Sequence, residues 1–142
     1  IEMPAANQIE IHPWHVIPQP LAEYMDKHEI LPIAYSTLAP IPNWREGSRW
    51  NGKPEDMKSG AMPCEDIANK YQVTVPQLFL KWAIQLGYPV LPKSVKNYRL
   101  KENLSLDHFE ISLDDMNSIS NIAINEQKCL AWSGDFDPLE VD

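Results

Sequence analysis

The sequence predicts an α/β protein with a parallel sheet, because short apolar strands alternate with helical segments along the chain. Strand-like patterns occur at residues 5–11, 30–35 and 88–91, and helical patterns lie between and after them. Alternation of this kind typically gives parallel strands with right-handed crossovers. Three parallel strands leave two open edges, which invite pairing with another chain. We therefore expect the chain either to be incomplete or to fold against a partner.

Proline positions divide the N-terminal third of the chain. Pro13, Pro18 and Pro20 predict a loop over residues 12–19. A helix follows over residues 21–28, and its periodicity places Leu21, Tyr24 and Met25 on one face. Pro32 removes one donor from the second strand, so it should lie at the start of that strand or where no ladder bond is needed.

Residues 36–63 are rich in proline and glycine and predict a long loop. A loop of this length in a compact domain is usually functional or disordered, and a tolerated surface insertion is the alternative. Trp44 or Trp50 could cover a cofactor or line a substrate pocket, and a plain surface loop explains both residues equally well.

Capping signals organise the C-terminal half. A short helix is expected over residues 64–71, with Ile67, Ala68 and Tyr71 facing inward. Thr74 and Gln77 form a capping-box pattern for a helix that runs to Leu86. Gly87 ends that helix, and a further helix is expected over residues 97–104. Ser112 is a suitable N-cap for a last helix, and the pattern fades into a tail from Asn125.

Composition limits the class of partner. The net charge of −8 disfavours nucleic acid and anionic membrane surfaces, although a local basic pocket can exist in an acidic protein. No apolar run approaches the roughly 20 residues that span a bilayer. Cys64 and Cys129 could pair, but free thiols in a reducing, cytoplasmic setting are the preferred interpretation. His12 and His15 have no partner at metal-ligand spacing, so we expect no metal site.

Four stretches resemble the motifs of the aldo-keto reductases. Residues 7–14 read Asn-Gln-Ile-Glu-Ile-His-Pro-Trp, and residues 33–38 read Ile-Ala-Tyr-Ser-Thr-Leu. Residues 67–71 read Ile-Ala-Asn-Lys-Tyr and lead to Gln77 and Trp82. Residues 91–95 read Leu-Pro-Lys-Ser-Val and lead to Arg99, Glu102 and Asn103. Each motif is weak alone, but their order and spacing together cover the chain to about residue 122.

This resemblance implies the C-terminal portion of a TIM (β/α)8 barrel. Residues 1–122 would form about three β/α units, with barrel strands six to eight, and an extra helix. Residues 123–142 would then form the tail. Active sites of such barrels lie at the C-terminal ends of the strands, and phosphate commonly binds after strands seven and eight.

The residues after the third strand have the chemistry of an anion site. Lys93 and Ser94 follow that strand directly, and Arg99 lies in the first turn of the next helix. The resemblance assigns Lys93, Ser94, Val95 and Arg99 to the 2′-phosphate of NADP(H). It assigns Glu102 and Asn103 to the adenine amino group. The alternatives are a solvated basic surface and an ordinary helix surface.

The second strand carries the other cofactor candidates. By resemblance, Tyr35 would stack on the nicotinamide and Gln8 would bind its carboxamide, whereas ordinary core roles are the alternative for both. Ser36 and Leu38 would lie along the pyrophosphate. Ala39 departs from the family pattern, which has a glycine that lets the backbone approach this group.

No residue of this chain matches the catalytic tyrosine, lysine, aspartate and histidine of the family, which belong to earlier strands. The chain would therefore be the NADP-binding portion of an NADPH-dependent aldehyde or ketone reductase, inactive alone and dependent on the missing half of the barrel. The alternative is a truncated, non-catalytic subunit with a structural role in an assembly. The start at Ile1 favours the first reading. Trp132 and Phe136 are substrate-pocket candidates in the tail, and the substrate itself cannot be derived.

Overall fold

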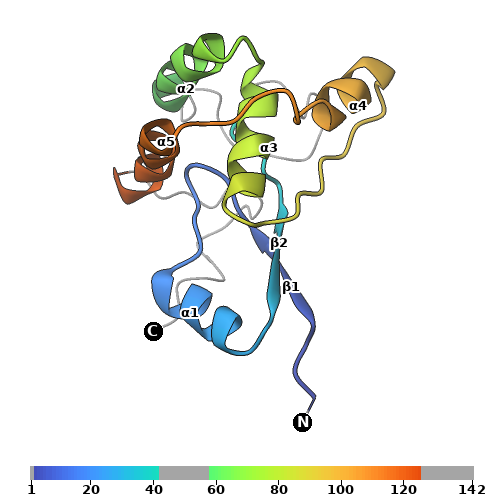
Figure 1. Ribbon diagram of the computed structural model, residues 1–142, viewed down its shortest axis with the longest axis vertical. Coiled ribbons are helices and arrows are strands. Elements are labelled where there is room, and N and C mark those ends of the chain that lie inside the picture. Colours follow the sequence, from blue (N-terminus) through green and yellow to red (C-terminus); the bar gives the residue numbers. More distant parts are fainter. Residues whose placement is uncertain (1, 42–57, 126–142) are drawn as a thin grey trace.

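The computed structural model describes residues 2–41 and 58–125 (Figure 1). Strand β1 (Ala6–Glu10) is followed by helix α1 (Gln19–Lys27) and strand β2 (Leu31–Tyr35). Four helices complete the described chain: α2 (Lys58–Lys70), α3 (Val75–Gln85), α4 (Asn97–Leu104) and α5 (Leu113–Asn125). The fold is thus α/β, as the alternation of patterns predicted.

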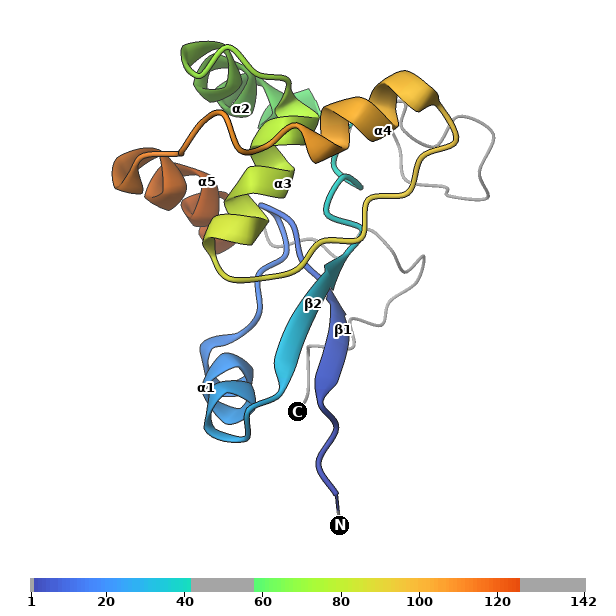
Figure 2. The same ribbon diagram turned by 45° about the vertical axis from the view of Figure 1, so that its right-hand side comes forward.

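The two strands run parallel and side by side, with Ala6 level with Leu31 and Glu10 level with Tyr35 (Figure 2). The third predicted strand is reduced to one bridge, in which Val90 lies parallel to Ala34. The flanking Pro89 and Pro92 have no N–H to donate, so this segment has few ladder bonds to offer. Pro32 is the second residue of β2, near the strand's start as expected.

Three helix predictions required correction. Helix α1 begins at Gln19, because Pro20 fits the first turn, where its missing N–H costs nothing. Tyr24 is 49% exposed and packs beside the ring of His28, so the inward stripe of α1 is centred on Met25 instead. Helix α2 begins at Lys58, within the predicted long loop, and it includes Pro63 at the cost of one backbone hydrogen bond.

Helix α3 forms the centre of the core. Residues 77–83 are buried without a break, which marks a helix covered on all sides. In both ribbon views α4 lies to one side of α3, and α2 and α5 lie to the other (Figures 1 and 2). The ring of Phe79 meets Trp14 edge-on, and Trp82 donates Nε1–H to Ser120 Oγ at 3.0 Å. Helix α3 therefore joins the segment after β1 to the last helix.

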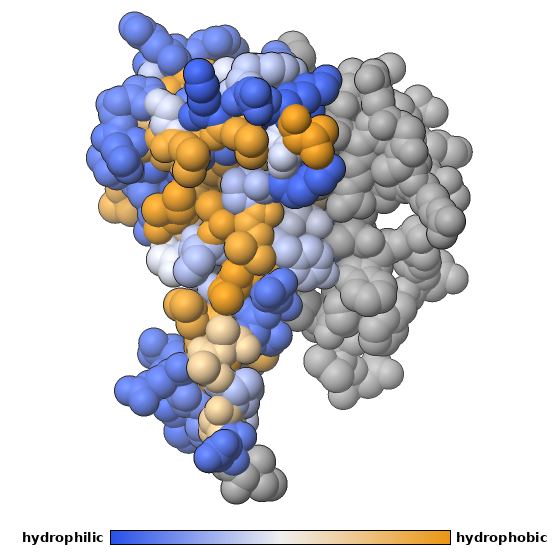
Figure 3. Space-filling model, turned by 90° about the vertical axis from the view of Figure 1, so that its right-hand side faces the viewer, coloured by the Kyte–Doolittle hydropathy of each residue, from blue (hydrophilic) through white to orange (hydrophobic). Residues whose placement is uncertain are grey.

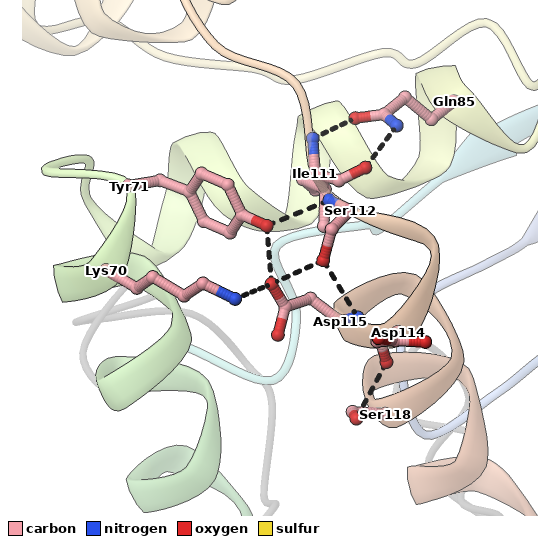
Figure 4. Close-up of polar contacts among 8 residues, drawn as sticks. All are labelled: Lys70, Tyr71, Gln85, Ile111, Ser112, Asp114, Asp115 and Ser118. Atoms are coloured by element: carbon pink, nitrogen blue, oxygen red, sulfur yellow. Dashed lines mark hydrogen bonds and ion pairs between the residues drawn. The ribbon is translucent and has the colours of Figure 1, made fainter.

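Local caps and one polar network fix the helices. The Thr74–Gln77 capping box is formed as predicted. Asp115 accepts hydrogen bonds from Lys70, Tyr71 and Ser112, and the Tyr71 hydroxyl accepts from the backbone N–H of Ser112 (Figure 4). This network ties the end of α2 to the start of α5. Ile67, Ala68 and Tyr71 pack on the core as expected.

Cys64 is a buried, free thiol, and burial raises its pKa to about 12. A thiol with this pKa stays protonated and unreactive at neutral pH. Cys129 lies outside the described residues. No helix in the described part of the chain is both long and apolar enough to span a bilayer.

Candidate functional site

Two groups of candidate residues, one after β2 and one after Val90, lie beyond the C-terminal end of the parallel strands. Tyr35 is the last residue of β2, and the Ala34–Val90 bridge places Lys93 beyond the same edge. Because parallel strands end together, two segments that are far apart in the sequence meet here. The predicted grouping of the Tyr35 and Lys93 segments follows from this register.

Gln8 and Tyr35 share one face of the sheet. The register pairs Gln8 with Ile33 and Glu10 with Tyr35, and side chains two residues apart along a strand point to the same side. Ile9 and Ala34 point to the opposite side and are buried in the core. Gln8 is exposed and Tyr35 is half-buried, so this face presents an amide and an aromatic ring.

The turn after β2 is tightly formed. Ser36 has a positive φ of 55°, and the backbone N–H of Ala39 donates to Ser36 O at 2.8 Å. Leu38 and Ala39 are both buried, and Leu38 belongs to the hydrophobic core. The side chain of Leu38 therefore anchors the turn, which leaves its backbone as the part that could meet a ligand.

The anion corner consists of Lys93, Ser94, Val95 and Arg99 around the start of α4. Ser94 Oγ accepts the backbone N–H of Lys96, the N-cap residue of α4, at 3.1 Å. The side chain of the N-cap residue Lys96 makes no capping hydrogen bond, so within the described residues the first N–H groups of α4 and the positive end of its dipole are available to an anion. Val95 is 79% exposed, and the Arg99 guanidinium lies 5.8 Å from the ring centre of Tyr98.

Positive charge is concentrated at this corner. Residues 93–101 contain Lys93, Lys96, Arg99 and Lys101 and no acidic residue, in a chain of net charge −8. None of the four forms an ion pair with a described residue. Unpaired cations next to an uncapped helix start attract an anion with several oxygens, such as a phosphate.

Glu102 and Asn103 lie at the other end of α4. The Glu102 carboxylate accepts a hydrogen bond from Thr74 Oγ1, and its backbone oxygen accepts from Gln77 Nε2 at 3.3 Å. Gln77 Nε2 also donates to Ser105 O at 2.9 Å. Asn103 is buried. These contacts fasten α4 to the start of α3, and they give Glu102 a partner within the protein.

Two features of this edge escaped the sequence analysis. Thr37 is 4% exposed, and its Oγ1 has no hydrogen-bond partner among the described residues. Glu10, the last residue of β1, and His12 and His15, which follow the strand, are also buried. Their burial follows from long-range packing, which no local pattern reveals. The ionisable residues Glu10 and His12 at alternate positions were the available sequence signal.

His12 and Glu10 are tied together within this cluster. His12 Nε2 lies 2.9 Å from Glu10 Oε1, while its Nδ1 accepts the backbone N–H of Trp14 at 3.2 Å. Burial lowers the pKa of His12, and the Glu10 carboxylate opposes this effect. Among the residues that the structure describes, no group of three His, Cys, Asp or Glu could hold a metal ion. Trp44, Trp50, Trp132 and Phe136 lie outside the described residues.

Comparison with known proteins identifies the class of fold and then the family. A parallel α/β arrangement with an anion corner at the strand ends is typical of phosphate-binding α/β proteins. The model of the Aldo/keto reductase family matches residues 2–124. The chain belongs to the aldo/keto reductase family.

Relatives and solved structures agree with this assignment. Aldose reductase C of Dictyostelium discoideum is 33% identical over 126 residues, covering 89% of this chain and 35% of that protein. NADP-dependent D-sorbitol-6-phosphate dehydrogenase of Malus domestica is 36% identical over 124 residues, covering 84% and 36%. The crystal structure of Gox0644 in its apo form matches with a TM-score of 0.72 and 28% identity, covering 94% and 42%. The chain thus spans little more than a third of the curated relatives that it matches.

Proposed function

We propose that this chain forms the NADP(H)-binding portion of an NADPH-dependent carbonyl reductase. It would supply strands six to eight of a (β/α)8 barrel, and the catalytic residues would lie outside it. The observation that carries the proposal is the anion corner, where Lys93, Ser94 and Arg99 lie at or next to the start of α4 and have no charged partner among the described residues. Two further relationships support it: a mutant of Gox0644 has been solved with NADPH, and a Bombyx mori aldo-keto reductase with NADP.

Each part of the cofactor would meet a different group of residues. Lys93 and Arg99 would pair with the 2′-phosphate, helped by the Ser94 hydroxyl and by Val95. A phosphate with three acceptor oxygens matches an ammonium, a guanidinium fork and free backbone N–H groups. Glu102 and Asn103 would meet the adenine amino group. For Glu102, this requires the carboxylate to share its bond with Thr74.

The nicotinamide end would lie against the face that Gln8 and Tyr35 share. The amide of Gln8 would bind the carboxamide, while the Tyr35 ring would fix which face of the nicotinamide is turned to the substrate. Ser36 and the backbone of Leu38 would follow the diphosphate. When bound, the cofactor would supply a hydride, which a small carbonyl substrate would receive. Trp132 and Phe136 would contact that substrate.

Proton donation would come from residues outside this chain. No residue here matches the family's catalytic set, and general acid catalysis requires the acid within hydrogen-bond reach of the substrate oxygen. We therefore expect the chain alone to bind cofactor without reducing carbonyls. The remaining strands of the barrel, on the same or another polypeptide, would cover the open sheet edges.

Cofactor titration tests this proposal directly. NADPH added to the purified chain should change the fluorescence of both the cofactor and the protein, and adenosine 2′-monophosphate should compete with NADPH. Carbonyl reduction should be absent with the chain alone. An unchanged signal at millimolar NADPH would refute cofactor binding by this chain, and turnover by the chain alone would refute the placement of the catalytic residues elsewhere.

A second candidate is a non-catalytic subunit that has a structural role. The observation that favours it is a band of hydrophobic residues on the face that carries α4 and the sheet (Figure 3). Exposed apolar side chains include Leu31, Leu91 and Val95. Such a band on a soluble protein usually marks an interaction surface. Stable association with a partner that lacks the catalytic set, without NADPH binding, would favour this candidate.

A further inference from the structure

Thr37 carries a buried hydroxyl that no described residue satisfies. Its side chain is almost fully enclosed, and Oγ1 is the one buried side-chain oxygen or nitrogen in the described ranges that has no hydrogen-bond partner. Buried polar groups almost always have a partner, because an unpaired one loses its hydration without compensation. The hydroxyl therefore calls for a partner other than the residues that the structure describes.

The position of Thr37 connects it with the anion corner. Ala34 lies level with Val90, and Thr37 and Lys93 each follow three residues after that pair. Both residues therefore lie beyond the C-terminal end of the strands. Thr37 follows β2, and Lys93 follows the segment that is bridged to β2. Thr37 lies within the turn that the hydrogen bond from Ala39 N to Ser36 O closes. The side chain of Leu38 in the same turn is buried in the hydrophobic core. The hydroxyl is held in place and is not on a freely swinging side chain.

We propose that Thr37 Oγ1 donates a hydrogen bond to a diphosphate oxygen of the bound dinucleotide. This inference rests on the proposed function. In the proposed binding mode the nicotinamide lies at Tyr35 and the 2′-phosphate lies at Lys93 and Arg99. The diphosphate between them must then pass the C-terminal end of the strands. The residues after β2 lie along that path. A phosphate oxygen is a strong acceptor, and it supplies the partner that the hydroxyl lacks.

The contact would use a side chain that the family pattern lacks. The family pattern that the sequence resembles has proline at the position of Thr37, and proline has no hydroxyl. The next departure from that pattern, Ala39 in place of glycine, leaves less room for the backbone to approach the diphosphate. A side-chain donor at Thr37 would offset this loss by reaching the phosphate without close backbone approach.

The test uses Thr37→Val in the full 142-residue chain. Valine keeps the branched shape of threonine and removes only the hydroxyl. The dissociation constant for NADPH should rise about 10-fold, the effect of one lost hydrogen bond to a charged group. The affinity for adenosine 2′-monophosphate, which has no diphosphate, should stay unchanged. Thr37→Ser should restore NADPH binding.

Stability of the free protein gives a second, independent measurement. Because Oγ1 has no hydrogen bond to a described residue that the substitution could remove, the urea midpoint of Thr37→Val should equal or exceed that of the wild type. A lower midpoint would show that the hydroxyl is satisfied without ligand and would overturn the inference. Equal NADPH affinity of the variant and the wild type would also overturn it, while leaving the proposed function intact. Failure of the wild type to bind NADPH would instead refute the proposed function, and with it this inference.

Discussion

His12 donates its Nε2–H to Glu10 Oε1 across 2.9 Å in the interior of the protein, where both side chains are at most 2% exposed. The other ring nitrogen accepts the backbone N–H of Trp14, which assigns the neutral tautomer with its proton on Nε2. Protonation would therefore break the Trp14 contact and bury an additional charge. The fold therefore holds His12 in its neutral form.

This arrangement predicts a loss of stability in mild acid. Burial lowers the pKa of His12 below its ordinary value of 6.5, so His12 binds a proton more readily in the unfolded chain than in the folded chain. The free energy of unfolding should then fall as the pH decreases below about 6.5. Urea unfolding between pH 7.5 and 5.5 measures this slope, and His12→Gln should flatten it. His108→Gln, at an exposed position, is the matched control, and an equal effect of both variants would contradict the assignment.

The Asp115 network predicts a second acid transition at lower pH. Hydrogen bonds from Lys70, Tyr71 and Ser112, with that from Lys70 the strongest, lower the pKa of Asp115 from 3.8 to about 2. Stability that is present above pH 4 should therefore be lost as the pH falls towards 2. Because Lys70 is largely exposed, solvent screens part of this effect.

Asp115→Asn should thus cost about 1 kcal/mol at pH 7 and should reduce the pH dependence between 4 and 2. Asp114→Asn serves as the control, because Asp114 accepts the hydrogen bond from Ser118 with its backbone oxygen, which the substitution leaves in place (Figure 4). Thermal unfolding followed by circular dichroism compares the two variants. Equal destabilisation by both would mean that the helix dipole, rather than the network, accounts for the effect.

The anion corner predicts discrimination between NADPH and NADH. Lys93→Ala and Arg99→Ala should each weaken NADPH about 10-fold or more, because each removes a charge-assisted bond to the 2′-phosphate. The affinity for NADH, which lacks this phosphate, should change much less. Calorimetric titration with both cofactors measures the difference. Lys27→Ala, at an exposed position in the last turn of α1, is the matched control, because it removes a lysine that is not part of the anion corner. Equal losses for NADPH and NADH would refute the 2′-phosphate assignment.

Local signals made part of this fold predictable from sequence. Helix α4 has the predicted bounds of 97 and 104, and the Thr74–Gln77 capping box forms because its bonds lie within four residues. The start of α2 and the single-residue bridge at Val90 were not predictable in the same way. They depend on packing and on neighbouring strands, which a local pattern does not contain.

The candidate site also contains features that local sequence patterns predict and features that depend on long-range packing. That the segments of Tyr35 and Lys93 leave the sheet at the same end follows from strand order and parallel direction, and the bridge between Ala34 and Val90 is consistent with it. The buried hydroxyl of Thr37 and the Glu10–His12 pair arise from contacts that close only in three dimensions. The roles of Gln8, Ser36, Leu38, Glu102 and Asn103 in binding cofactor remain predictions.

The Ala34–Val90 bridge determines how firmly the anion corner is held. Within the described ranges, residues 88–92 are bonded to the sheet only through Ala34, which donates to Pro89 O at 2.8 Å and accepts from Leu91 N at 3.2 Å. Two hydrogen bonds therefore join the segment before Lys93 to the sheet, and a ligand at the corner would have to offset the entropy of ordering this segment further. If a further strand paired with Val90 on the side away from Ala34, the segment would already be ordered before the ligand binds. Such a strand would raise the affinity for an anion without touching it.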